Sequence, residues 1–151
     1  FALAAAIALL AARGGRLATL AGVLLVASAG IFSAHSTQIL SNQQRLNRWD
    51  QMQARDITQM AVGKFSGQAS KLALVDSDWG HDVAREIAQG DLNISALSVA
   101  WALDPLFDEA TGRDQTVRLA PEFSEFCSTS PKYPDPASLH LENGEVVVCM
   151  Q

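Results

Sequence analysis

The sequence predicts an α/β protein in which a membrane helix, with the remnant of a preceding one, leads into a small extracytoplasmic α/β domain with a short sheet and a C-terminal β-hairpin. Residues 1–34 are almost uncharged and rich in Ala and Leu, whereas all sixteen acidic residues lie further along the chain. The later part alternates short apolar runs with helical patterns and ends on a hairpin signal. A membrane region followed by a soluble domain accounts for this asymmetry.

Residues 17–34 carry no ionisable side chain. At about 1.5 Å of rise per residue, a helix of this length measures roughly 27 Å, which is close to the hydrocarbon thickness of a bilayer. Small residues among Leu and Val suit close approach between helices in lipid, whereas a soluble amphipathic helix would need a polar face. We therefore expect a transmembrane helix that packs against neighbouring membrane helices.

The segment before this helix is interpreted from its length and charge. Residues 1–12 are apolar but too short to cross a bilayer, and the chain begins with Phe, so we interpret them as a truncated helix. Residues 13–16, Arg-Gly-Gly-Arg, then form a cytoplasmic turn by the positive-inside rule. Residues 35–151 are accordingly expected on the periplasmic side of a bacterial inner membrane. The alternative, a hairpin in a soluble protein, would expose much apolar surface.

The charge of the remainder argues against one class of partner. From His35 onward there are nine Lys and Arg against sixteen Asp and Glu, a formal charge of about −7. Nucleic-acid binding requires a basic surface, so we expect no nucleic-acid partner. The same stretch is long enough for one small domain with a single core.

The two cysteines, Cys127 and Cys149, both fall in the part assigned outside the cytoplasm, where disulfides persist. They bracket a Pro-rich segment next to an apolar run, and we expect them to be bridged. Closing such a loop would stabilise the domain by about 3 kcal/mol. Two buried free thiols are the alternative, and the spacing does not indicate a zinc site.

Residues 35–70 are expected to form a linking helix and a loop. Apolar residues recur at helical spacing over 38–62, with an interruption near Asp56, and a loop follows over 63–70. The apolar run 71–75 fits a buried strand and opens the extracytoplasmic domain, 71–151.

Helices and strands are then expected in alternation. Acidic residues after the first strand favour a helix start near residue 77, and this helix ends at Gly90. A second helix is expected over 104–109, with a proline in its first turn and Gly112 as its C-terminal signal. A strand over 116–119 follows.

The C-terminal part is expected to be a loop and a hairpin. Residues 121–136 hold four of the five prolines and suggest an irregular loop. Residues 138–141 and 145–149 flank Asn143-Gly144, which is a strong signal for a two-residue β-turn.

Acidic residues and a histidine follow the first strand at its carboxyl end, where open α/β sheets bind ligands: Asp76, Asp78, His81 and Asp82. Such side chains could hold a divalent cation. An aspartate here more often caps the next helix, so we assign no metal and keep Asp76, Asp78 and His81 only as an alternative.

Aromatic residues offer a possible contact with sugar rings. Trp79 and Tyr133 stand among polar and turn residues and are the candidates for surface aromatics, although buried aromatics are usual in a small core. The sequence has no nucleophile elbow, phosphate-binding glycine loop, metalloprotease pair or Cys/His nucleophile. We therefore expect neither a catalytic residue nor a cofactor in this stretch.

The order of several segments suggests a family. A membrane helix is followed by Asn47-Arg48-Trp49-Asp50, by LALVD at 72–76, by GDLNISA at 90–96 with Trp101-Ala102 after it, and by YPDPAS at 133–138 before GEVVV at 144–148. In this order the chain resembles the C-terminal end of bacterial O-antigen-modifying glucosyltransferases, which are polytopic membrane enzymes of the GT-C architecture.

The resemblance implies an enzyme that moves a hexose, glucose in the first instance, from a polyprenyl-phosphate carrier to a surface glycan such as lipopolysaccharide. The catalytic carboxylate of that architecture lies in an early extracytoplasmic loop, to which no residue here corresponds. This domain would then face the glycan acceptor through Asp91, Asn93, Ser95 and Trp101, each equally explicable as a turn or core residue.

A second hypothesis is a membrane-anchored sensor domain, or an envelope assembly module, without enzymatic activity. It fits the anchor, the linking helix and the disulfide equally well. A sensor is expected to continue into another membrane helix, and the hairpin close to Gln151 favours the transferase.

Overall fold

The computed structural model of the chain describes residues 12, 15–66, 70–76 and 94–150. It divides into two compact units, residues 1–41 and residues 42–151. The expected helix up to Gly90 and the candidates Asp78, Trp79, His81, Asp82, Asp91 and Asn93 lie outside the described residues.

One helix, α2 (Gly15–Phe65), begins in the first unit and ends in the second. The expected interruption near Asp56 is absent, and the helix starts two residues before Leu17. No proline occurs in this range and isolated glycines are tolerated in a helix, so nothing in the sequence breaks it. The transmembrane and linking helices expected separately are therefore one element, which also takes up the first residues of the expected loop 63–70.

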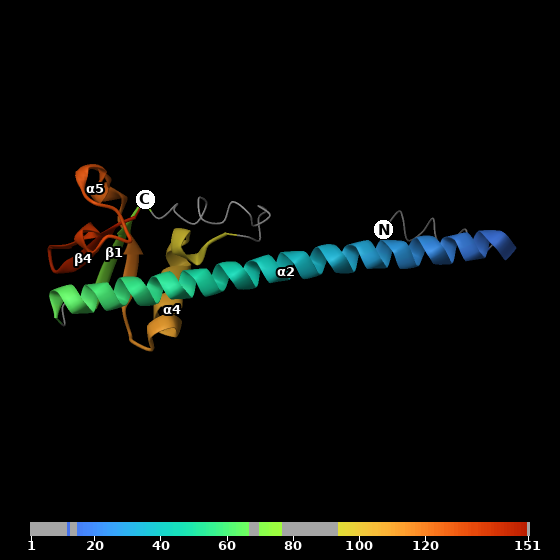
Figure 1. Ribbon diagram of the computed structural model, residues 1–151, viewed down its shortest axis with the longest axis horizontal. Helices are drawn as coiled ribbons and strands as arrows, with labels where there is room; N and C mark the ends of the chain where they lie inside the picture. The colour runs from blue at the N-terminus through green and yellow to red at the C-terminus, as the bar shows by residue number, and fades with distance from the viewer. Residues whose placement is uncertain (1–11, 13–14, 67–69, 77–93, 151) are drawn as a thin grey trace. The chain divides into compact units, whose positions relative to one another are not determined.

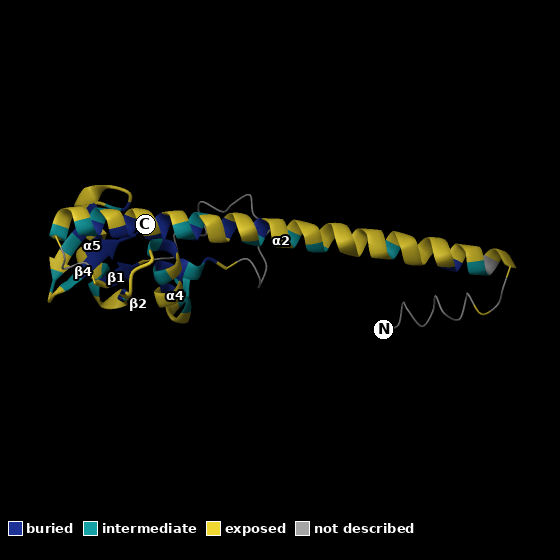
Figure 2. Cartoon of the chain, turned by 90° about the horizontal axis from the view of Figure 1, so that it is seen from below, coloured by how far each residue is buried: buried dark blue, intermediate teal, exposed yellow. Residues whose placement is uncertain are grey.

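The first unit presents an apolar helix surface. Within the described residues, most side chains of α2 up to residue 41 are exposed, as Figure 2 shows by their colour. They include eight large apolar ones: Leu20, Val23, Leu24, Leu25, Val26, Ile31, Phe32 and Leu40.

The second unit is built on a small mixed sheet (Figure 1). Its strands are β1 (Lys71–Val75), β2 (Thr116–Leu119), β3 (Leu139–Glu142) and β4 (Glu145–Cys149), in the order β2-β1-β4-β3. The central strand β1 runs parallel to β2 and β4, and β3 runs antiparallel to β4. The predicted strands and C-terminal hairpin are confirmed.

Alternation along β1 gives the sheet two buried faces. Leu72 and Leu74 belong to the larger core, whereas Ala73 and Val75 belong to a smaller one on the opposite face. A central parallel strand is buried on both faces, which explains why this strand is a continuous apolar run.

Among the described residues, two α-helices contribute to the larger core: α2, through Ala54, Ile57 and Ala61, and α4 (Ala100–Thr111). Figures 1 and 2 both place the C-terminal part of α2 alongside the sheet. A short 3-10 helix, η2 (Ala96–Ser98), precedes α4.

The helix α4 starts at Ala100, not at residue 104 as expected, and encloses Pro105. The earlier start places four apolar residues at helical spacing in the core: Leu103, Leu106, Phe107 and Ala110. This burial offsets the backbone hydrogen bond that proline cannot make. Gly112 ends the helix with φ 66° and donates its N–H to the Asp108 carbonyl (2.8 Å), as predicted.

The Pro-rich segment forms short helices and is not an irregular loop. It contains η3 (Pro121–Phe123), α5 (Ser124–Thr129) and η4 (Pro136–Ser138), so the expectation of an irregular loop over 121–136 is wrong. In η3 and η4 the proline occupies the first helical position, where its missing N–H costs nothing.

The smaller core contains Cys127 and Cys149, which the structure places at disulfide distance as expected, with Cα atoms 5.3 Å apart. The bridge connects α5 to the end of β4. At the hairpin, Asn143 and Gly144 both have positive φ (52° and 81°), which matches the predicted two-residue turn.

Replacing both cysteines with alanine should lower the free energy of unfolding by about 3 kcal/mol, because the bridge closes a loop between residues 22 apart. Urea denaturation of the full chain in uncharged detergent, followed by tryptophan fluorescence, would measure the loss. Reductant should move the wild-type midpoint to that of the double variant and leave the double variant unchanged. Equal midpoints for the oxidised wild type and the double variant would contradict the prediction.

Candidate functional site

Of the residues predicted to face a sugar, three are described: Ser95, Trp101 and Tyr133. They lie in very different environments. Trp101, in the first turn of α4, is 83% exposed, whereas Ser95 and Tyr133 are buried. The structure does not bring these three into one described pocket.

Ser95 caps η2 and connects it to α2. Its hydroxyl donates to Asp50 Oδ1 (2.8 Å) and accepts from the Leu97 N–H (3.2 Å), while Asp50 Oδ2 accepts from the Ala96 N–H (2.7 Å). Burial raises the pKa of the Asp50 carboxyl, and the hydrogen bonds from Ser95 and Ala96 partly oppose that rise. These hydrogen bonds make Ser95 a structural link.

The expectation that Tyr133 lies on the surface is wrong. The residue is 2% exposed and belongs to the larger core, while its hydroxyl donates to Asp56 Oδ2 (2.7 Å). The polar and proline residues around it in the sequence hid an aromatic ring that fills the core. Burial raises the pKa of Tyr133 above its ordinary value, and the hydrogen bond to Asp56 adds to the rise.

Asp76, at the end of β1, has φ 55° and accepts a hydrogen bond from the Ser124 hydroxyl (2.7 Å). Within the described residues no group of three His, Cys, Asp or Glu side chains could hold a metal ion. Asp78 and His81 lie outside the described residues, so the alternative metal site at Asp76, Asp78 and His81 stays a prediction.

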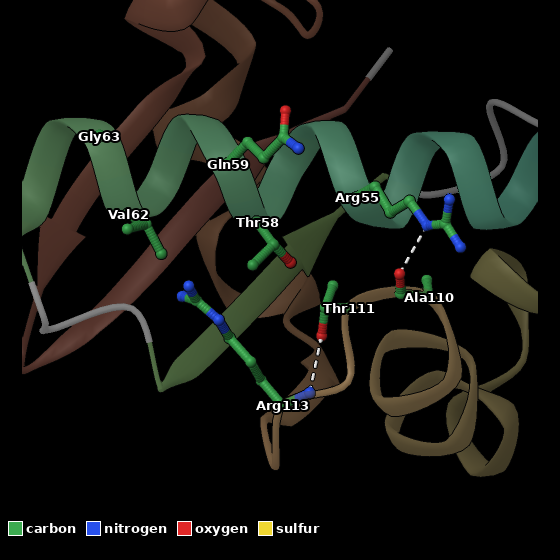
Figure 3. A pocket seen from close by; sticks show the side chains of 8 residues that line it. All are labelled: Arg55, Thr58, Gln59, Val62, Gly63, Ala110, Thr111 and Arg113. Carbon is green, nitrogen blue, oxygen red and sulfur yellow. Dashed lines mark hydrogen bonds between the residues drawn. The ribbon is translucent and has the colours of Figure 1, made fainter.

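A pocket of about 360 Å³ lies between α2 and the end of α4 (Figure 3). We call it the arginine pocket; it is lined by Arg55, Thr58, Gln59, Val62, Gly63, Ala110, Thr111 and Arg113. Figure 3 shows Arg113 extending toward α2 from the segment after α4, and Arg55 reaching from α2 toward the end of α4. The two guanidinium groups thus come from opposite walls.

Neither guanidinium in this pocket pairs with a carboxylate of the described residues. Arg55 Nε donates to the Ala110 carbonyl, and Arg113 bonds only through its backbone N–H, to Thr111 Oγ1 (3.3 Å). Arg118, by contrast, pairs with Glu145 (2.8 Å) and Glu122, and these hydrogen bonds raise its pKa. The arginine pocket therefore offers cationic donors that the described protein leaves available.

The hydroxyls of the arginine pocket serve the fold. Thr58 donates to Gln115 Oε1 (3.0 Å), and Thr111 donates to the Phe107 carbonyl (2.7 Å). Neither hydroxyl donates to a carboxylate or a histidine of the described residues. Sequence reasoning missed this site because Arg55 and Arg113 are far apart in the chain and neither belongs to a motif.

A second groove, of about 340 Å³, runs along an adjacent face of α2. It is lined by Trp49, Met52, Gln53, Arg55, Asp56, Gln59 and Tyr133. Aromatic, amide and carboxylate groups together are the side chains that contact polar ligands with an apolar face.

Comparisons with protein-family models, with curated proteins and with solved structures gave no match to this chain. Its function is therefore argued from the residues and their geometry.

Asp50→Asn should alter the pH dependence of stability without preventing folding, since an amide can accept from Ala96 and donate to the Ser95 oxygen. A carboxyl whose pKa is raised in the folded state contributes most to the free energy of unfolding below its ordinary pKa of 3.8, and this contribution falls as pH rises through the raised value. The urea midpoint of the wild type minus that of the variant should therefore decrease above pH 3.8.

The control for this experiment is Asp50→Ala. It leaves the Ser95 hydroxyl and the Ala96 N–H without their acceptor, and it should lower the free energy of unfolding by about 2 kcal/mol at neutral pH. A midpoint difference between wild type and Asp50→Asn that grows with pH would show that hydrogen bonding outweighs burial at Asp50.

Proposed function

We propose that the chain is a membrane-anchored, non-catalytic extracytoplasmic domain of a polytopic hexosyltransferase. The parent enzyme would move a hexose, glucose in our proposal, from a polyprenyl-phosphate carrier to a surface glycan. The observation that carries the proposal is the apolar surface of α2 in the first unit.

The proposed membrane anchor is supported by how little of the apolar surface of α2 is buried by other residues. The helix is long and apolar enough to cross a membrane. Within the described structure, only 6% of its most apolar stretch of 18 residues is buried. A core helix of a soluble protein buries most of its apolar side chains, whereas eight large ones are exposed on α2 up to residue 41. A bilayer provides the apolar environment that the described protein does not.

The extracytoplasmic part of the proposal is supported by the cysteine pair. Cys127 and Cys149 lie at disulfide distance in the smaller core, and the described part of the chain has no free cysteine. Structural disulfides persist in oxidising compartments and are rare in the cytosol.

The transferase part is supported by the order of segments that resembles the glucosyltransferases, and the groove along α2 is consistent with it. Trp49, from one of those segments, lines the groove together with Asp56 and Tyr133. We propose this groove and the exposed Trp101 as the surfaces that face the glycan acceptor.

An anchored binding module without enzymatic activity is the second candidate. Among the described residues we find no group of His, Cys, Asp or Glu side chains that could hold a metal ion. A non-catalytic part of a larger enzyme and an independent binding module both satisfy this observation, so sugar transfer itself must distinguish them.

Val26→Arg should release the chain from membranes. Val26 is 71% exposed in the apolar part of α2, and an arginine at the centre of a membrane helix costs about 3 kcal/mol or more in insertion. Resistance to alkaline carbonate extraction would measure the effect. Met52→Arg is the matched control, because Met52 is 62% exposed on the same helix but outside 17–34. Equal extraction of both variants would contradict the proposed anchor.

In cells that make the complete protein, transfer of hexose to the surface glycan should require a polyprenyl-phosphate sugar. Trp101→Ala should lower that transfer about tenfold at unchanged protein level, because an exposed ring contributes to ligand contact and not to the core. Trp101→Phe should retain most of the transfer.

Glycan labelling with protein quantified by immunoblot would measure both quantities. A phenotype that persists without the sugar carrier would favour the binding module. Unchanged transfer in Trp101→Ala would remove Trp101 from the acceptor surface while leaving the transferase proposal intact.

A further inference from the structure

We propose that protonation of His140 loosens the contact between the edge strand β3 and α5, so that this corner of the second unit responds to acid. Three observations carry the inference: a buried ring nitrogen without a hydrogen-bond partner among the described residues, the aromatic contact of the same ring, and a lysine held at the same strand. The inference requires neither the membrane anchor nor the transferase, and it can fail or hold without them.

His140 lies on the edge strand of the sheet, on the face of the smaller core. In the strand order β2-β1-β4-β3, β3 has one hydrogen-bonded neighbour among the described strands, which is β4. His140 stands directly opposite Val147, which belongs to the smaller core, so both side chains lie on that face. An edge strand leaves one row of its backbone groups unpaired, and side-chain packing therefore matters more for keeping β3 in place.

The imidazole of His140 packs against an aromatic ring of α5. The centroids of the His140 and Phe126 rings are 4.9 Å apart and their planes are nearly perpendicular (87°), which is an edge-to-face contact. His140 Nε2 is buried and has no hydrogen-bond partner among the described residues. A protonated imidazole carries an N–H on both nitrogens, so the charged form has a buried donor at Nε2 without an acceptor.

The charges around His140 on balance oppose its protonation. The Lys64 ammonium, from α2, donates to the carbonyl of the residue before His140 (2.8 Å) and so holds a positive charge at the same strand. Burial, followed by repulsion from Lys64, lowers the pKa of His140 from its ordinary value of 6.5, and Glu142 on the same strand opposes this lowering. Glu125 of α5 and Glu145 of β4 do not contribute to the shift.

The disulfide limits what protonation can release. Cys127 follows Phe126 in α5 and is bridged to Cys149 of β4. The helix α5 therefore remains attached to β4 when the contact between His140 and Phe126 weakens. The expected change is a local opening at β3 and not the separation of α5 from the sheet.

The test compares the pH dependence of stability of the wild type and of His140→Gln, using the full chain in uncharged detergent with the disulfide intact. Because the pKa of His140 is lower in the folded state, the unfolded chain takes up the proton first as pH falls below 6.5. The urea midpoint of the wild type minus that of the variant should therefore fall between about pH 8 and about pH 5. Other groups titrate in both proteins, so this difference isolates His140.

Two further variants keep the test decisive. His140→Phe retains an aromatic ring against Phe126 but cannot titrate, so the midpoint difference between wild type and this variant should also fall in acid. His35→Gln is the matched control, because His35 is an exposed histidine of α2 in the first unit. It should follow the wild type at every pH. Circular dichroism at neutral pH would establish that each variant is folded.

Hydrogen exchange would locate the change. The ratio of the exchange rate of the wild type to that of His140→Gln should rise over residues 139–142 when the pH is lowered from about 8 to about 5, and it should stay constant over residues 71–75. Taking this ratio at each pH cancels the intrinsic pH dependence of exchange.

Three outcomes would overturn the proposal. The first is a midpoint difference between wild type and His140→Gln that stays constant, or that rises because a cation–π attraction between the charged imidazole and Phe126 outweighs burial. The second is a change of the same size in His35→Gln. The third is a rise in the exchange ratio that is equal over β1 and β3.

Discussion

The packing of one narrow face of α2 into the larger core is the constraint on which the rest of the second unit depends. Ala54, Ile57 and Ala61 are fully buried, and the two alanines let the helix backbone approach its neighbours closely. Polar contacts fix the helix on either side of this face. Asp50 accepts hydrogen bonds from Ser95 and Ala96, and the Lys64 ammonium donates to the carbonyls of Pro136 and Leu139. Once that face is buried, the neighbouring faces of α2 must line the arginine pocket and the second groove.

The parts of the fold that follow local rules could be predicted from the sequence. The apolar run at β1 reflects a strand buried on both faces, and Asn143-Gly144 supplies the positive φ values that a two-residue turn requires. Gly112 ends α4 for a similar reason, since it adopts the left-handed conformation. In the strand, the turn and the helix end alike, local backbone geometry decides which residue types fit.

The features that depend on tertiary packing were the ones that sequence reasoning missed. The start of α4 is set by burial of Leu103, which outweighs the unfavourable Pro105, and the burial of Tyr133 depends on Asp56, far away in the chain. The arginine pocket is the extreme case. In the sequence, Arg55 is an ordinary exposed helix residue and Arg113 is an ordinary turn residue. Only the fold brings Arg55 to the end of α4, where its Nε donates to the Ala110 carbonyl. No pattern of period 2 or 3.6 carries that information.

The arginines of the second unit differ in how far nearby carboxylates compensate their charge. Arg118 is held by Glu122 and Glu145, so its charge is largely compensated, whereas Arg55 and Arg113 have no carboxylate partner among the described residues. The acidic excess from His35 onward disfavours polyanionic partners such as nucleic acids. Arg55 and Arg113 are therefore cations whose charge no described carboxylate pairs with directly, although the unit as a whole is acidic.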